Sequence, residues 1–107
     1  MLYEYRRYEA SPGKLPALNR RFAELTTKLW EKHGIKPVGF FVAEVGTSNE
    51  LHYILQWEDM ADREKKWDAF QQDPDWHKGR AESEKDGPLV ARLTNSFWRP
   101  TNYSPMK

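Results

Sequence analysis

The stretch over residues 65–79 gathers side chains that could do chemistry. It places three aromatic residues, Trp67, Phe70 and Trp76, beside a histidine, His77, in a run that is otherwise charged and amide-rich. A neutral imidazole over an aromatic-lined pocket could act as a general base on an acidic phenol or on a carbon next to a carbonyl. The alternative is that His77 is an exposed residue in the first turn of a polar helix. His77 is therefore a candidate catalytic residue with both interpretations open.

The two other histidines have structural explanations as well as catalytic ones. His33 stands just before Gly34, at the C-terminus of a predicted helix, where the helix dipole favours an imidazolium. It is kept as a second candidate catalytic residue. His52 alternates with apolar residues in a predicted strand, so a hydrogen-bonded structural role is the default. The three histidines have no mutual ligand spacing, so no metal site is predicted.

Charged residues next to aromatic ones offer a second kind of site. Arg63 precedes Trp67 by one helical turn, so it could stack on an aromatic ring or hold a substrate carboxylate, as well as form a plain salt bridge. Glu4 and Arg6 lie two apart on a predicted strand and share a face. They could hold a carboxylate or polarise a carbonyl, but an ion pair satisfied within a dimer interface is the favoured interpretation.

The aromatic side chains are expected to form the core first and a pocket second. In this kind of fold a pocket would have the same lining as the core, so residue types alone do not separate the two. The candidate ligand-binding residues are Tyr5, Phe40, Trp57, Arg63, Trp67, Phe70 and Trp76.

Periodic patterns predict the elements that must position these residues. Apolar residues in steps of three and four predict an amphipathic helix from Leu15, ended by Gly34 in a left-handed conformation. Asp59 is typical of the N-cap of a second helix, and Asp73 with the proline after it predicts a break and a new cap. The second piece would cover residues 75–84. Alternating or aromatic-rich segments predict strands over residues 2–8, 38–45, 51–58 and 89–99.

The resulting order is β-α-β-β-α-β, which predicts an α+β fold of the ferredoxin-like type. Residues 1–100 would form a single domain with an antiparallel four-stranded sheet and two helical segments on one face, followed by a tail over residues 101–107. The strand over residues 38–45 is apolar on both faces. Because the helices cover only one face, we expect a homodimer that meets through the sheet faces.

Composition excludes several classes of function. The 107 residues carry 17 Lys plus Arg against 16 Asp plus Glu, a formal charge of +1, with the two signs interleaved. No nucleic-acid partner and no membrane surface is therefore expected. There is no cysteine, which excludes disulfides, thiolate metal sites and a cysteine nucleophile. No apolar run approaches the roughly 20 residues that span a bilayer, and no signal peptide is recognised, so a cytoplasmic location is expected.

Several segments, taken together and in order, resemble the NIPSNAP family. They are LYEYRRYEASPGK at the start, KHG at a helix end, VGFFVAEVG, NELHYILQWED with the Arg63 that follows, and DPDW. The resemblance covers about residues 2–99. It implies a dimeric α+β barrel, in agreement with the pattern above. It implies no particular reaction, because NIPSNAP-type domains have no established common activity.

The wider barrel superfamily also implies a haem alternative. Its members include haem-degrading monooxygenases, cofactor-independent quinone-forming monooxygenases and small isomerases. In the resemblance to the haem-degrading members, Trp67 falls where they have a tryptophan, and His77 lies ten residues further on. Aligning DPDW, however, shifts the haem-ligand position to about Arg80, and the first strand has Glu4 or Arg6 where those proteins have asparagine. Haem binding or degradation is therefore the less favoured hypothesis.

Two hypotheses of different kinds remain. In the first, the protein binds or transforms a small apolar or aromatic metabolite without a cofactor, in the manner of a cofactor-independent monooxygenase or isomerase. In the second, it is a non-catalytic homodimeric binding or interaction module. Polar groups that converge on an enclosed aromatic cavity would favour the first, and a fully packed interior would favour the second.

Overall fold

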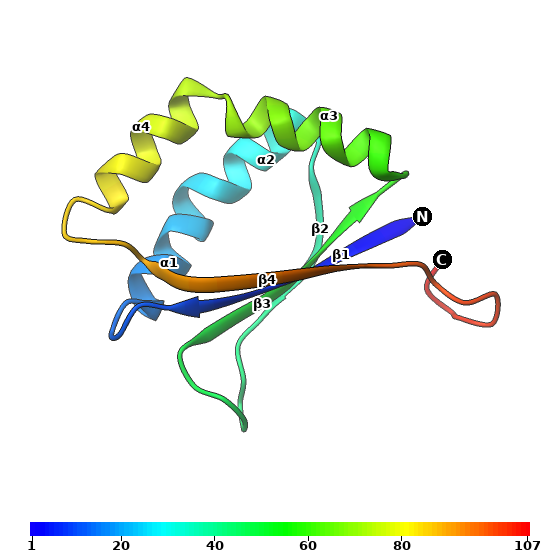
Figure 1. Ribbon diagram of the computed structural model, residues 1–107, viewed down its shortest axis with the longest axis horizontal. Coiled ribbons are helices and arrows are strands. Elements are labelled where there is room, and N and C mark those ends of the chain that lie inside the picture. Colours follow the sequence, from blue (N-terminus) through cyan, green and yellow to red (C-terminus); the bar gives the residue numbers. More distant parts are fainter.

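The computed structural model describes residues 1–107 as one antiparallel sheet with every helix on the same face (Figure 1). The strands are β1 (Leu2–Ala10), β2 (Lys36–Phe41), β3 (Glu50–Trp57) and β4 (Val90–Trp98), in the spatial order β2-β3-β1-β4. One helical run comprises α1 (Leu15–Arg21), a π-helical turn η1 (Phe22–Thr26) and α2 (Thr27–His33). The other comprises α3 (Met60–Gln71) and α4 (Pro74–Ser83). The predicted ferredoxin-like order is confirmed.

The helix ends lie where local chemistry predicts them. The Asp59 carboxylate accepts a hydrogen bond from the Asp62 backbone N–H at 2.8 Å and so caps α3. Asp73 caps α4 in the same way, through the Asp75 backbone N–H at 2.8 Å. Gly34 ends α2 with φ of 74°, a conformation that costs glycine little. The break between α3 and α4 thus follows from a capping residue and a proline rather than from packing.

The second strand is shorter than predicted. Its ladder ends where Phe41 pairs with His52, and residues 42–49 form a loop that projects from the sheet (Figure 1). The predicted strand over residues 38–45 is therefore wrong in its second half. The reason is that β3 begins only at Glu50, so at most two further residues could have found partners. Val45 is 95% exposed, and its apolar character alone does not make a strand.

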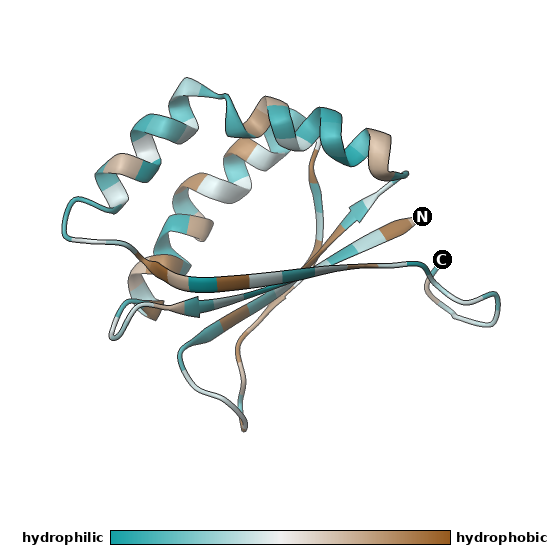
Figure 2. Ribbon diagram, viewed as in Figure 1, coloured by the Kyte–Doolittle hydropathy of each residue, from teal (hydrophilic) through white to brown (hydrophobic).

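The two helical runs contribute unequally to the core. Figure 2 shows α3 and α4 as largely hydrophilic along their length, so their packing rests on a few large aromatic side chains. Phe70 is almost fully buried, Trp76 is buried and Trp67 packs against the same cluster.

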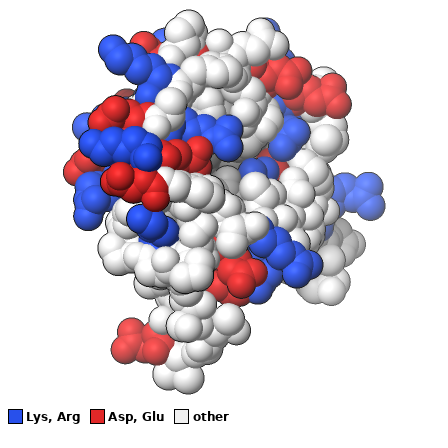
Figure 3. Space-filling view, turned by 60° about the vertical axis from the view of Figure 1, so that its left-hand side comes forward, with Lys and Arg blue, Asp and Glu red and all other residues white.

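On the face that Figure 3 shows, basic and acidic side chains are interleaved and leave no large patch of one sign.

Candidate functional site

The central strand β1 carries a fully buried carboxylate, Glu4, on its helix-covered side. Its Oε2 accepts hydrogen bonds from Arg6 Nη1 at 2.9 Å, Asn95 Nδ2 at 2.9 Å and Arg63 Nη2 at 3.2 Å. Its Oε1 accepts from Trp57 Nε1 at 3.2 Å and Arg63 Nε at 3.3 Å. Burial raises the pKa of Glu4, but these donors outweigh it and leave the pKa below its ordinary value. Glu4 is therefore a saturated anchor and not a general base.

Arg6 is the buried cation that Glu4 holds. It donates from Nη1 to Glu4, from Nε to the Tyr53 hydroxyl at 2.7 Å and from Nη2 to the Tyr8 hydroxyl at 3.1 Å. Its Cζ lies 4.7 Å from the centroid of the Trp67 ring. Burial alone would lower the pKa of Arg6, yet the neighbouring Tyr53, Tyr8 and Glu4 hold it above the ordinary value. The side chain thus stays charged at every working pH.

This placement corrects one expectation about the pair. Glu4 and Arg6 do form an ion pair on a shared face, but the face is the interior of the protomer and not a dimer interface. Because β1 pairs with both β3 and β4, its helix-facing side lies at the centre of the domain.

The two tyrosine hydroxyls beside Arg6 leave one hydrogen without an acceptor. The hydroxyls of Tyr8 and Tyr53 lie 2.7 Å apart, and each accepts an N–H from Arg6. The two hydroxyls carry two hydrogens, and only one of these is used in the hydrogen bond between them. One O–H is therefore free to donate. Burial raises the pKa of Tyr53 well above its ordinary value, so that phenol stays neutral. Tyr8 lines a cavity, which gives the free O–H a place to act.

A cavity of about 260 Å³ lies between the sheet and both helical runs. Arg6 and Tyr8 of β1 form part of its sheet wall, and Arg21, Thr26 and Arg80 line it from the helices. Its apolar lining comes mainly from six side chains, Phe22, Trp30, Trp67, Phe70, Trp76 and Leu93. The cavity is thus aromatic over much of its surface, with polar groups at defined points.

Three residues that line this cavity each carry a buried polar atom without a partner in the protein. These atoms are Arg21 Nε, Thr26 Oγ1 and Trp30 Nε1, from side chains that are all more than nine-tenths buried. All three residues come from one stretch of helix around η1, where the Thr27 backbone N–H bonds to the Phe22 carbonyl and the helix widens into a π turn. Such turns are frequent at functional sites, and buried polar atoms without partners are rare in native proteins.

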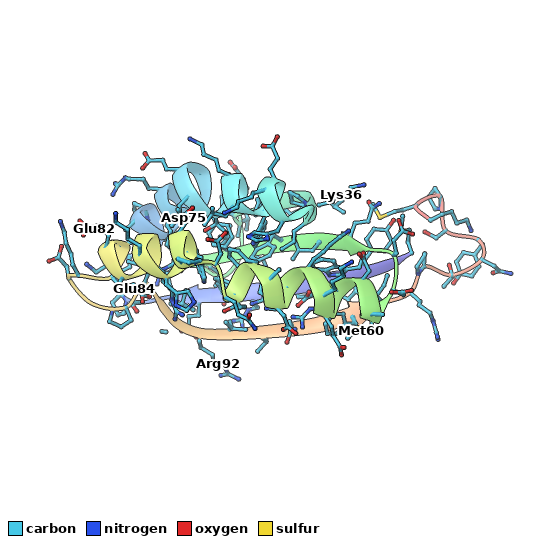
Figure 4. The ribbon with its side chains drawn as sticks, turned by 90° about the horizontal axis from the view of Figure 1, so that it is seen from above. Lys36, Met60, Asp75, Glu82, Glu84 and Arg92 are labelled. Atoms are coloured by element: carbon cyan, nitrogen blue, oxygen red, sulfur yellow. The ribbon has the colours of Figure 1, made fainter.

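At the outer end of the cavity, two arginines share one carboxylate. Arg21 Nη1 lies 3.4 Å from Glu84 Oε2, and Arg80 Nε lies 3.5 Å from Glu84 Oε1. Figure 4 shows Glu84 just past the C-terminal end of α4, whereas Arg92 of β4 extends away from the body of the molecule. The Arg21 guanidinium also lies 5.5 Å from the centroid of the Trp76 ring. Both contacts to Glu84 are long for charge-assisted hydrogen bonds, so the arginines are only partly compensated.

The predicted ligand-binding residues divide into three groups. Trp67, Phe70 and Trp76 line the cavity. Arg63 and Trp57 lie behind it, where they hold Glu4.

The third group lies elsewhere. The ring of Phe40 lies 6.0 Å from that of Trp30 and belongs to the aromatic core next to the cavity. Tyr5 is on the opposite face of the sheet, where its hydroxyl lies 2.6 Å from His52 Nδ1 and its ring stacks on Trp98.

The two candidate catalytic histidines do not line the cavity. His77 is exposed and borders a shallow hollow on the outer side of Trp76. His33 Nε2 lies 2.7 Å from Asp73 Oδ2, which also receives Lys32 Nζ at 2.9 Å. Lys32 and then His33 hold the pKa of Asp73 well below its ordinary value. His33 therefore ties the end of α2 to the start of α4.

Sequence patterns missed the polar part of the site. Arg21, Thr26 and Trp30 were not candidates, although Arg21 and Thr26 interrupt the apolar stripe of their helix. Thr26 stands four residues after Phe22 and four before Trp30, so helical spacing already places it on the buried side. A polar residue at a core position of an amphipathic helix was the signal that could have found this site.

The cavity does not suit the two cofactor types weighed from sequence. No histidine, cysteine or methionine side chain lines it, so the imidazole, thiolate and thioether ligands of haem iron are missing, and the Tyr8 hydroxyl is engaged by Arg6 and Tyr53. No group of three or more His, Cys, Asp or Glu side chains in the protein could hold a metal ion. None of the helices is both long and apolar enough to cross a lipid bilayer.

Fold and cavity together define a class of protein, the ferredoxin-like α+β domains with a cavity between sheet and helices. The sequence model of the NIPSNAP family matches residues 3–105, and the protein belongs to the NIPSNAP family. The resemblance found in the sequence is thus confirmed. No curated protein sequence matches the chain significantly.

Solved structures agree with this assignment. The protein is similar to a NIPSNAP family protein with unknown function from Agrobacterium tumefaciens, with 26% identity, a TM-score of 0.87, and 100% of this chain and 94% of the other covered. It is also similar to an uncharacterised NIPSNAP-like domain protein from Burkholderia xenovorans, with 21% identity, a TM-score of 0.85, and 97% and 88% covered. An antibiotic biosynthesis monooxygenase shares the fold at 14% identity and a TM-score of 0.63, with 94% and 99% covered.

Proposed function

We propose that this NIPSNAP-family domain binds a small, ring-bearing and largely apolar metabolite in the cavity between its sheet and helices. The observation that carries the proposal is the set of three buried polar atoms without partners, Arg21 Nε, Thr26 Oγ1 and Trp30 Nε1, at an aromatic cavity. The volume of about 260 Å³ lies just below the usual range for ligand pockets, which favours a ligand of one or two rings.

The same donors support a catalytic form of this function. Arg6 and the free hydroxyl hydrogen of the Tyr8–Tyr53 pair would stabilise negative charge that develops on a carbonyl or phenol oxygen. Such stabilisation is what a cofactor-independent monooxygenase or isomerase needs from its protein. Glu84 is the one carboxylate that lines the cavity and could take a proton, whereas His77 borders only the adjacent hollow.

Ligand binding is expected to shift the NMR signal of one particular indole. The chain has five tryptophans, and a ring-bearing ligand in the cavity should move the Trp30 Nε1–H resonance, because that N–H has no partner. The Trp98 indole lies on the opposite face of the sheet, so its N–H resonance should not shift. Two-dimensional proton–nitrogen spectra during titration with phenols and aryl carbonyl compounds measure both signals.

Two neighbouring glutamines supply a matched pair of variants for the same titration. Gln71 lines the cavity and is exposed, so Gln71→Trp should cover the opening and weaken binding by about tenfold or more. Gln72 is exposed but does not line the cavity, and Gln72→Trp should leave the affinity unchanged. Equal affinities in the two variants would place the ligand elsewhere. A shift of the Trp98 indole resonance in place of the Trp30 resonance would do the same.

We also propose that the uncovered sheet face joins two copies of the chain. This face exposes Phe41 at 57% and Trp98 at 48%, beside the stack of Trp98, Tyr5 and His52. Contiguous exposed apolar groups of this kind are typical of interaction sites. The same surface would serve the alternative function, a non-catalytic homodimeric binding module.

A charge introduced on that face should separate the copies. Trp98→Glu is expected to convert a dimer into a monomer in sedimentation velocity at micromolar concentration, because it would bury a carboxylate in an apolar interface. Lys65→Glu on the exposed side of α3 is the control and should remain dimeric. A wild-type protein that sediments only as a monomer would end this proposal.

A further inference from the structure

We infer that the ligand of the cavity is an organic anion, a ring-bearing carboxylate whose oxygens are held by Arg21, Thr26 and Trp30. The inference rests on the proposed function and specifies the chemical class of its ligand. It comes from three properties of the lining: which hydrogen-bonding groups are free, how the charges balance, and where the rings lie.

The unpartnered polar groups of the residues that line the cavity are predominantly donors. An arginine Nε and a tryptophan Nε1 can only donate, and a threonine hydroxyl can do so. Arg21, Trp30 and Thr26 present these three groups without a partner. The Tyr8–Tyr53 pair adds one hydroxyl hydrogen with no acceptor. A ligand that satisfies them must therefore supply several acceptor lone pairs at one end, as a carboxylate does with its two oxygens.

The charges around the cavity are unbalanced in the same direction. Three guanidiniums line the cavity, those of Arg6, Arg21 and Arg80. Arg21 and Arg80 both contact Glu84, and Arg6 shares Glu4 with Arg63, which lies behind the cavity. Burial lowers the pKa of Arg21, because Glu84 at 3.4 Å offsets the loss of hydration only in part. A buried and partly compensated cation favours an anionic ligand over a neutral one of the same shape.

The rings and the donors are arranged to hold the two ends of one molecule. Trp67 lies under Arg6, and Trp76 lies under Arg21, so a guanidinium stacks on each of two walls. Phe70 lies between these tryptophans, at 5.4 Å from Trp67 and 4.7 Å from Trp76. A ligand ring has this aromatic surface to pack on, while the helix around η1 supplies the donors for its carboxylate.

One pair of probes separates charge from shape. Phenylacetate and phenylacetamide have the same ring and nearly the same size, but only the first carries a negative charge. Calorimetric titration of the wild-type protein should give at least about tenfold tighter binding for phenylacetate. Added salt should weaken the binding of phenylacetate more than that of phenylacetamide, because an ion pair contributes only to phenylacetate binding.

Thr26→Val is the variant that tests the contact itself. Valine has the shape of threonine without its unpartnered hydroxyl, so the variant should fold and its urea midpoint should not fall below that of the wild type. Phenylacetate affinity should nevertheless drop by about threefold to tenfold. Thr27 is the next residue and does not line the cavity, so Thr27→Val is the matched control and should bind as the wild type does.

The outcomes distinguish this inference from the function on which it rests. If phenylacetamide binds at the cavity as tightly as phenylacetate, the anionic ligand is wrong while the binding function stands. If Thr26→Val and Thr27→Val bind phenylacetate equally, the assigned contact is wrong. If no ring-bearing probe of either kind shifts the Trp30 indole signal, the proposed function fails and this inference fails with it.

Discussion

Replacing Glu4 with leucine is expected to destabilise the fold by about 3–5 kcal/mol, a large part of the stability of a small domain. The substitution removes the only carboxylate that contacts Arg6 and leaves that guanidinium buried and uncompensated. It also takes the acceptor from Trp57 Nε1 and Asn95 Nδ2. Urea unfolding followed by circular dichroism measures the loss. Glu9→Leu, at an exposed position of the same strand, is the control and should change stability little.

The pH dependence of stability gives an independent test of the same carboxylate. The pKa of Glu4 is lower in the folded protein than its ordinary value of 4.5. Its charge therefore contributes stability that is present above the unfolded pKa and is lost as the pH falls through the folded pKa. Below about pH 4.5 the wild type should lose stability more steeply than Glu4→Gln, which has no charge to lose. Parallel acid profiles for the two proteins would show that Glu4 does not matter as an anion.

The general architecture could be predicted because its signals are local. Asp59 and Asp73 cap helices through their own side chains, and Gly34 ends one because of its own backbone freedom. Such features need no knowledge of the rest of the chain. The end of β2 could not be found in this way, since a strand ends where its partner ends, and the start of β3 at Glu50 is a property of the pairing.

Part of the cavity lining could also be predicted, because its signals are local. Aromatic spacing identified Trp67 and Phe70, because an inward face of a helix is a local property. The alternation of β1 placed Glu4 and Arg6 on one face of the sheet. It could not say whether the helices or a second chain would cover that face, and this decides whether the pair is interior or interfacial.

The donors of the cavity needed the three-dimensional structure. Thr26 interrupts an apolar stripe, but only the packing of η1 against α4 shows that its hydroxyl is buried and without a partner. The histidines are the opposite case. Their side-chain chemistry made them candidate catalytic residues, but their positions in the fold do not support that role. His77 borders the solvent and His33 is engaged by Asp73, so neither reaches the cavity.

Removing Arg6 together with Glu4 should recover much of what the loss of Glu4 costs. In Glu4→Leu the greatest penalty is an unpaired buried cation, so adding Arg6→Met replaces it with an apolar side chain of similar length. We expect the double variant to be about 2 kcal/mol more stable than Glu4→Leu alone, as contacting residues are not additive. A double-mutant cycle from urea unfolding measures the coupling. Losses that simply add would contradict the role of Glu4 as the anchor of Arg6.

The double variant also separates folding from binding. Without Arg6 the hydroxyls of Tyr8 and Tyr53 lose the donor that orients them, and the cavity loses one of its cations. Phenylacetate should then bind at least about tenfold more weakly, even though the protein is folded. A folded double variant that keeps wild-type affinity would show that the anion is held at η1 alone. The expected result instead assigns β1 two tasks, with Glu4 fixing the cation and Arg6 presenting it to the ligand.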